Sequence, residues 1–213
     1  MSAGCCGSDT GSRTGPTDGR QRVILWIALA VNATMFVVEI VAGHAARSAS
    51  LQADALDFLA DSANYAISLF VLGAALSWRA RAALVKGLSM GMLGLWVIAT
   101  TAWNALAGTV PEAPVMGVVG VLALIANAGV LALLIGFRSG DANMRSVWIC
   151  SRNDVLANIA VVMAAAGVFG TGTGWPDYVV AAVMASLSLQ GATQITRQAL
   201  AERREARAPS PAA

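Results

Sequence analysis

Long apolar stretches separated by short polar links make up most of the chain. Six stretches run from about Val23 to Gly43, Leu51 to Trp78, Ala82 to Ala107, Val115 to Phe137, Val147 to Phe169 and Tyr178 to Ala199. A helix of roughly 20 apolar residues crosses a hydrocarbon core about 30 Å thick. Because the links are short, consecutive helices should run antiparallel. The pattern predicts an all-α membrane protein with six transmembrane helices.

Composition agrees with this interpretation and excludes a large soluble domain. Of the 213 residues, 57% are hydrophobic and only 12% are charged, against about a quarter charged in an average soluble domain. We expect a disordered cytosolic tail over residues 1–21, a six-helix transmembrane domain over 22–201 and a cytosolic tail over 202–213. The net charge of +2 gives no indication of a nucleic-acid partner.

The positions of the basic residues predict the orientation of the chain. Of 14 basic residues, only Arg47 lies in an odd-numbered link. Twelve lie in the N-terminal tail, the second and fourth links or the C-terminal segment, namely Arg13, Arg20, Arg22, Arg79, Arg81, Lys86, Arg138, Arg145, Arg197, Arg203, Arg204 and Arg207. The positive-inside rule then predicts cytoplasmic termini and a multi-pass protein of the bacterial inner (plasma) membrane.

Three aspartates on the second predicted span are the strongest functional signal. Asp54, Asp57 and Asp61 occupy positions i, i+3 and i+7, which share one face of a helix. An ionised Asp at the bilayer centre costs at least about 2.5 kcal/mol on the insertion scale. A cation is therefore expected there, and a divalent metal ion suits carboxylate oxygens.

The fifth span repeats this spacing and supplies further candidate ligands. Cys150 and Asp154 are four residues apart, as are Asp57 and Asp61. Asn153 and Asn158 flank the same face and would contribute an amide oxygen or orient a ligand. For an isolated Asp, a helix-packing hydrogen bond or an ion pair remains an alternative, and Cys150 alone would be a small buried hydrophobe.

Arg152 is the one basic residue predicted to lie inside a span, so it must neutralise an acid or reach water. Asp54 and Glu39 are its candidate partners, which gives Arg152 a structural or gating role. Glu39, on the first span, is alternatively a proton carrier or a ligand on the ion's path. Cys5 and Cys6 are adjacent in the N-terminal tail, where the pair would either collect soft metal or be inert.

These residues resemble the cation diffusion facilitator family of metal–proton antiporters, over all six spans. The resemblance lies in NATMFVVEIVAG of the first span, SLQADALDFLADSAN of the second, Asn127, the WPD at Trp175 to Asp177, and NMRSVWICSRND of the fifth. It places metal binding on Asp57, Asp61, Asp154 and Cys150.

The chain departs from this family in two respects. Cys150 stands where the commonest members carry His, which bears on metal preference. Typical members continue into a cytosolic, dimer-forming domain of ferredoxin-like type, whereas this sequence resembles a short form. Any homodimer is therefore expected to form through the membrane helices.

The resemblance implies a secondary active transporter, not an enzyme, that exports a divalent metal ion in exchange for protons. Zn²⁺ is the favoured substrate, with Cd²⁺, Co²⁺, Fe²⁺ or Mn²⁺ as alternatives, and no permanent cofactor is expected. No Walker-type nucleotide loop is present, so the proton gradient would supply the energy. Two other functions stay open: a membrane metal sensor or partner subunit, and a transporter of an organic cation.

Overall fold

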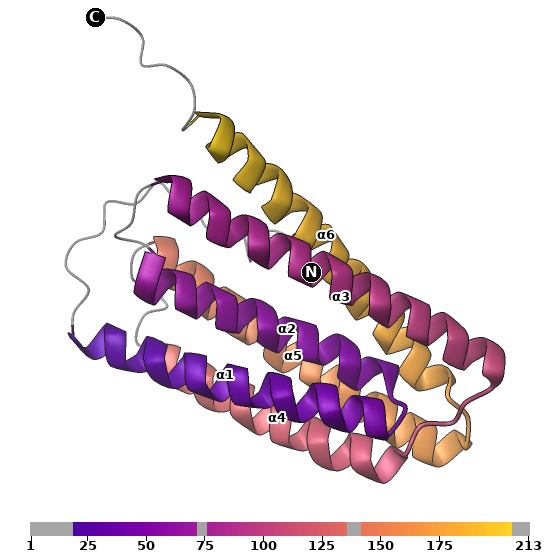
Figure 1. Ribbon diagram of the computed structural model, residues 1–213. Helices are drawn as coiled ribbons and strands as arrows, with labels where there is room; N and C mark the ends of the chain where they lie inside the picture. Colours follow the sequence, from indigo (N-terminus) through magenta and orange to yellow (C-terminus); the bar gives the residue numbers. More distant parts are fainter. Residues whose placement is uncertain (1–18, 72–75, 136–141, 206–213) are drawn as a thin grey trace, which may run out of the picture.

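The computed structural model describes residues 19–71, 76–135 and 142–205. Six long helices lie side by side, and each runs antiparallel to the next (Figure 1). They are α1 (Gly19–Ala45), α2 (Ala49–Ala66), α3 (Leu76–Ala107), α4 (Ala113–Leu134), α5 (Ala142–Thr171) and α6 (Trp175–Glu205), with a π-helical turn, η1 (Ile67–Val71), after α2. The predicted all-α fold is confirmed.

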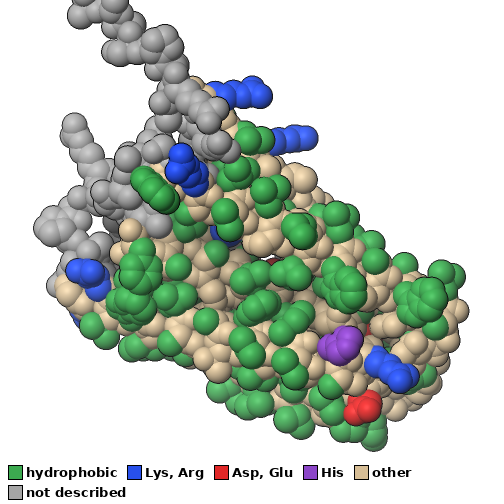
Figure 2. Space-filling view, in the orientation of Figure 1, with side chains coloured by type: hydrophobic (Ala, Val, Ile, Leu, Met, Phe, Trp, Pro, Cys, Tyr) green, Lys and Arg blue, Asp and Glu red, His purple; other side chains and the backbone are tan. Residues whose placement is uncertain are grey.

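Five of these helices are long and apolar enough to cross a membrane. The qualifying segments are Arg22–Ala45, Arg81–Ala107, Ala113–Leu134, Ser151–Thr171 and Trp175–Ala201. Large apolar side chains such as Leu106, Phe169 and Trp103 project outward, and hydrophobic residues cover much of the face in Figure 2, where acidic side chains are scarce. An exposed apolar surface of this extent suits contact with lipid. The chain is therefore a multi-pass membrane protein.

The remaining helix, α2, carries three aspartates within eight residues and lies at the centre of the bundle. Thirteen of its 18 residues are buried, and it contacts each of the other five helices. A helix that carries three aspartates would be costly against lipid. Its neighbours remove that cost by enclosing α2 on all sides.

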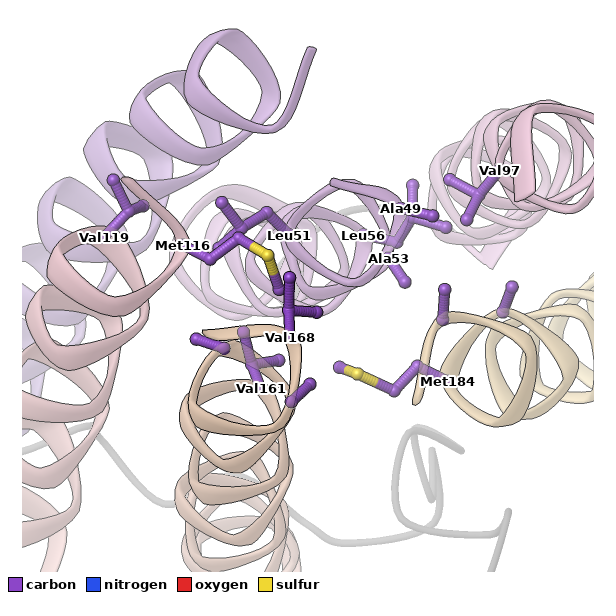
Figure 3. Packing of buried hydrophobic residues seen from close by; sticks show 14 residues of the cluster. Ala49, Leu51, Ala53, Leu56, Val97, Met116, Val119, Val161, Val168 and Met184 are labelled. Atoms are coloured by element: carbon purple, nitrogen blue, oxygen red, sulfur yellow. The ribbon is translucent and has the colours of Figure 1, made fainter. Parts of the chain in front are cut away.

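Apolar packing around the first half of α2 holds the bundle together. Leu51 and Leu56 of α2 are buried with Met116 of α4, Val161 of α5 and Met184 of α6, and Figure 3 shows these side chains converging between the helices. Small residues allow the close approach: a Cβ on Gly43 of α1 would lie 3.0 Å from the backbone nitrogen of Gln52.

A buried carboxylate from α6 caps the start of α2. Asp177 accepts hydrogen bonds from the Ser48 and Ser50 hydroxyls at 2.7 and 2.6 Å, and from the backbone N–H groups of Ala49 and Ser50 at 2.8 and 3.0 Å. The Ser48 hydroxyl accepts in turn from the Leu51 N–H at 3.2 Å. The first N–H groups of a helix lack partners within it and attract negative charge. Asp177 therefore fastens α2 to α6 at this end of the bundle.

The boundary between the second and third spans differs from the sequence-based prediction. The second span was expected to run to Trp78, with a link at Arg79 to Arg81, but α2 ends at Ala66 and α3 already begins at Leu76. Basic residues mark where a chain leaves lipid, yet a helix can continue beyond that point because long basic side chains extend to water. The tails predicted over residues 1–21 and 202–213 lie largely outside the described residues.

We expect Asp177→Ala to destabilise the protein by on the order of 3 kcal/mol. The substitution would leave two buried backbone N–H groups without an acceptor, and each such group costs about 1–3 kcal/mol. Thermal unfolding of the purified protein in detergent measures the effect. Thr34→Ala is the control, because that exposed hydroxyl donates only within its own helix, to the Ala30 carbonyl. Equal melting temperatures for Asp177→Ala and the parent would show that the cap does not hold α2.

Candidate metal-transport site

Carboxyl groups of α2 and α5 meet inside the bundle. Asp61 of α2 is buried, and its carboxyl group lies close enough to that of Asp154 of α5 to interact with it. Two carboxylates held close together repel each other. A nearby positive charge, from a proton or a cation, offsets this repulsion. The two helices predicted to share the site do converge.

Polar groups on three helices surround this pair. The Tyr65 hydroxyl donates to Asp61 Oδ2 at 3.4 Å and lies 3.4 Å from the Ser151 hydroxyl of α5. From α3, the buried Lys86 ammonium donates to Asn64 Oδ1 and acts electrostatically on Asp61. We call Asp61, Asp154, Tyr65, Asn64 and Lys86 the Asp61 cluster.

Lys86 was missed by the sequence analysis, which placed it in a cytoplasmic link. It is 6% exposed and lies one helical turn before the buried Met90. That spacing puts Lys86 on the face of α3 that packs into the bundle, and this periodicity was the signal available in the sequence. Its positive charge acts on the buried Asp61 carboxyl group.

Asp57 faces a different neighbour. It is half-buried, and the Ser188 hydroxyl of α6 donates to its Oδ1 at 3.3 Å. Ser188 was not among the predicted site residues, although it shares the buried face of α6 with Met184 and Ala192. Asp57 therefore links α2 to α6 in this structure, one turn away from the contact between Asp61 and Asp154.

A second group of buried polar residues lies nearer the Ser48 end of α2. Glu39 of α1, Asp54 of α2 and Asn158 of α5 are all 0% exposed. The Asn158 amide donates to Asp54 Oδ1 at 3.3 Å and to the Asp154 carbonyl at 2.8 Å. The carboxyl groups of Glu39 and Asp54 lie close enough to act on each other electrostatically. We call Glu39, Asp54 and Asn158 the Glu39 cluster.

Among the described residues, the contacts of Glu39 and Asp54 do not include the expected ion pair with Arg152. The Arg152 side chain is exposed, the Glu39 oxygens accept no hydrogen bond, and the one donor to Asp54 is Asn158. An arginine reaches water at a lower cost than it enters the bundle interior. Arg152 is accordingly directed outward, while Asn153, its neighbour on α5, is half-buried.

The full four-ligand set stays a prediction. Among the described side chains, no three Asp, Glu, His or Cys groups are close enough together to hold one ion. Cys150 lies on α5, but its side chain is outside the described residues, as are Cys5 and Cys6. The structure brings Asp61 and Asp154 together, and Asp57 lies one helical turn from Asp61.

The chain matches the family model of the cation efflux transmembrane domain over residues 25–202, and it belongs to this family. The match confirms the resemblance to the cation diffusion facilitators drawn from the motifs. It identifies a membrane transporter that exports metal cations rather than an enzyme. No curated protein matches the sequence.

Replacing the buried ammonium tests its role. We expect Lys86→Met to lower the stability of the metal-free protein by on the order of 3 kcal/mol, because removing one partner leaves the other polar groups of the cluster uncompensated. Thermal unfolding in the presence of a chelator measures the effect. Arg81→Met, an exposed basic residue on the same helix, is the control and should melt close to the parent. Equal melting of the Lys86 variant would remove Lys86 from the cluster.

Proposed function

We propose that this protein exports a divalent metal ion, with Zn²⁺ the favoured substrate, in exchange for protons. The contact between Asp61 and Asp154 is the observation that supports the proposal most strongly. Two acids held together in an apolar interior are stabilised by a bound positive charge, which either a proton or a metal ion can supply. Competition between a proton and a metal ion for the same two carboxyl groups is the basis of an exchange mechanism.

The proposed cycle uses residues of α2 and α5. Metal enters from the cytosolic side, displaces the proton shared by Asp61 and Asp154, and is held by these carboxylates with Asp57 and Cys150. A rocking movement of the helices then opens the site outward. Protons arriving from that side return to the carboxylates and release the ion. The proton gradient thereby drives export.

The cellular setting follows from the same proposal. The positive-inside distribution of basic residues supports cytoplasmic termini in a bacterial inner membrane. The Ala66 end of α2, with the Asp61 cluster, would then face the cytosol, and the Ser48 end would face outward. Protons and the metal ion are the substrates, and a homodimer would use the membrane helices.

Removing either carboxylate should stop transport. We expect Asp61→Asn and Asp154→Asn each to lower the initial rate of Zn²⁺ uptake into proteoliposomes by at least about tenfold, as losses of groups that support a metal site do. A pH-sensitive dye inside the vesicles reports coupled proton movement. Glu112→Gln is the control, since that exposed carboxylate makes no side-chain hydrogen bond at the start of α4.

The result also separates the proposal from its rivals. If the purified parent protein moves no metal, the sensor or partner-subunit function is favoured. If both Asn variants transport at the parental rate, the site is misplaced. Transport of a quaternary ammonium compound with no Zn²⁺ transport would favour an organic cation as substrate.

Cys150 is the residue expected to set metal preference. A thiolate favours Zn²⁺ and Cd²⁺, whereas oxygen ligands favour Mn²⁺. Cys150→Ser should therefore shift transport competition among these three ions toward Mn²⁺, while Cys6→Ser should leave their ranking unchanged. An unchanged ranking in the Cys150 variant would exclude its sulfur from the metal shell.

A further inference from the structure

The Glu39 cluster is a separate polar site. It lies nearer the Ser48 end of α2 than the Asp61 cluster does. Asp54 and Asp61 are seven residues apart, which corresponds to about 10 Å along a helix at 1.5 Å per residue. Its three side chains come from α1, α2 and α5, and each is fully buried. No part of the transport cycle proposed above uses them.

Four oxygen atoms in this cluster accept no hydrogen bond. They are both carboxylate oxygens of Glu39, Oδ2 of Asp54 and Oδ1 of Asn158. The Asn158 amide group is held at the cluster by the hydrogen bond from its nitrogen to Asp54. Asp57 adds a further negative charge that acts on Glu39. Buried polar atoms in folded proteins normally have partners, so these four need an explanation.

Asp177 shows what a purely structural buried carboxylate looks like in this protein. It is as fully buried as Glu39, yet its two oxygens accept four hydrogen bonds from Ser48, Ala49 and Ser50. Glu39 and Asp54 together receive one such bond, from Asn158. The cluster therefore has hydrogen-bond acceptors without donors. A bound cation would supply the positive charge that stabilises these oxygens in place of hydrogen bonds.

We propose that Glu39, Asp54 and Asn158 form a second cation site, which binds a divalent ion through oxygen atoms alone. Two carboxylates balance the charge of one divalent ion, and the amide oxygen is a third ligand. Carboxylate and amide oxygens suit hard ions such as Mn²⁺ and Mg²⁺. The site thus differs in ligand chemistry from the one that would contain Cys150, and it stands whether or not the protein transports Zn²⁺.

Binding stoichiometry tests the proposal independently of transport. The experiment measures Mn²⁺ bound to the purified full-length protein in detergent by equilibrium dialysis, in a background where Asp61→Asn and Asp154→Asn remove the other carboxyl pair. We expect this background protein to bind one Mn²⁺. Adding Glu39→Gln or Asp54→Asn should weaken that binding by at least about tenfold, whereas adding Glu112→Gln should leave it unchanged.

Two results would overturn the proposal. One is a folded background protein, with parental thermal unfolding, that binds no Mn²⁺ at saturating concentration. The other is undiminished binding after Glu39→Gln and after Asp54→Asn. If the carboxyl variants do not fold, Asn158→Leu, of similar size, removes the amide ligand instead, and unchanged Mn²⁺ affinity in that variant would also refute the site.

Retained Mn²⁺ binding in the background protein separates this proposal from the transport proposal. Loss of Zn²⁺ transport in Asp61→Asn with one Mn²⁺ still bound supports both. Parental Zn²⁺ transport in that variant refutes the transport site alone.

Discussion

The cost of placing carboxylates inside a membrane protein governs the arrangement of this bundle. Asp54, Asp57 and Asp61 all lie on α2, so α2 cannot face lipid without a large free-energy penalty. The other five helices pack around it and bear the apolar surface. The bundle is therefore organised around the helix that carries three aspartates, unlike a soluble protein, whose most apolar elements occupy the centre.

Enclosure alone does not stabilise buried acids, and the buried acids of this protein have two kinds of surroundings. Asp177 is satisfied by hydroxyl and backbone donors at the start of α2. Asp61 and Glu39 instead lie close to another carboxyl group, Asp154 and Asp54 respectively. Hydrogen-bond donors make the first arrangement permanent, whereas the second depends on an exchangeable cation or proton. This difference separates an acid surrounded by donors from acids that face another acid within a single chain.

Much of the fold could be predicted because hydropathy and loop residues report directly on transfer into lipid. The six helices and their antiparallel order follow from the apolar stretches and the short links between them. The approach of Asp61 to Asp154 follows from the spacing of acids along two of these helices. The boundary between α2 and α3 could not be predicted in this way, since Arg79 and Arg81 lie in the first turns of α3 rather than in a link. Long basic side chains allow a helix to continue past the apolar region.

The surroundings of the acids were harder to predict, because a single sequence does not state which helix faces which. Arg152 was expected to approach Glu39 or Asp54, yet it is exposed, and Asn158 contacts Asp54 instead. Lys86 lies inside the bundle beside Asn64, although its charge had placed it in a link. Tertiary packing decides these contacts, and neither periodicity nor charge distribution contains that information.

The two ends of α2 are held by different kinds of contact. At Ser48 the helix is bound to α6 through a charged group, while beyond Ala66 it passes into the π-helical turn of η1, whose hydrogen-bonding pattern is less regular than that of an α-helix. A tilt of α2 would pivot near Ser48, so the displacement at Asp61 would exceed that at Asp54. Such a tilt would change the distance between α2 and α5 most where Asp61 approaches Asp154.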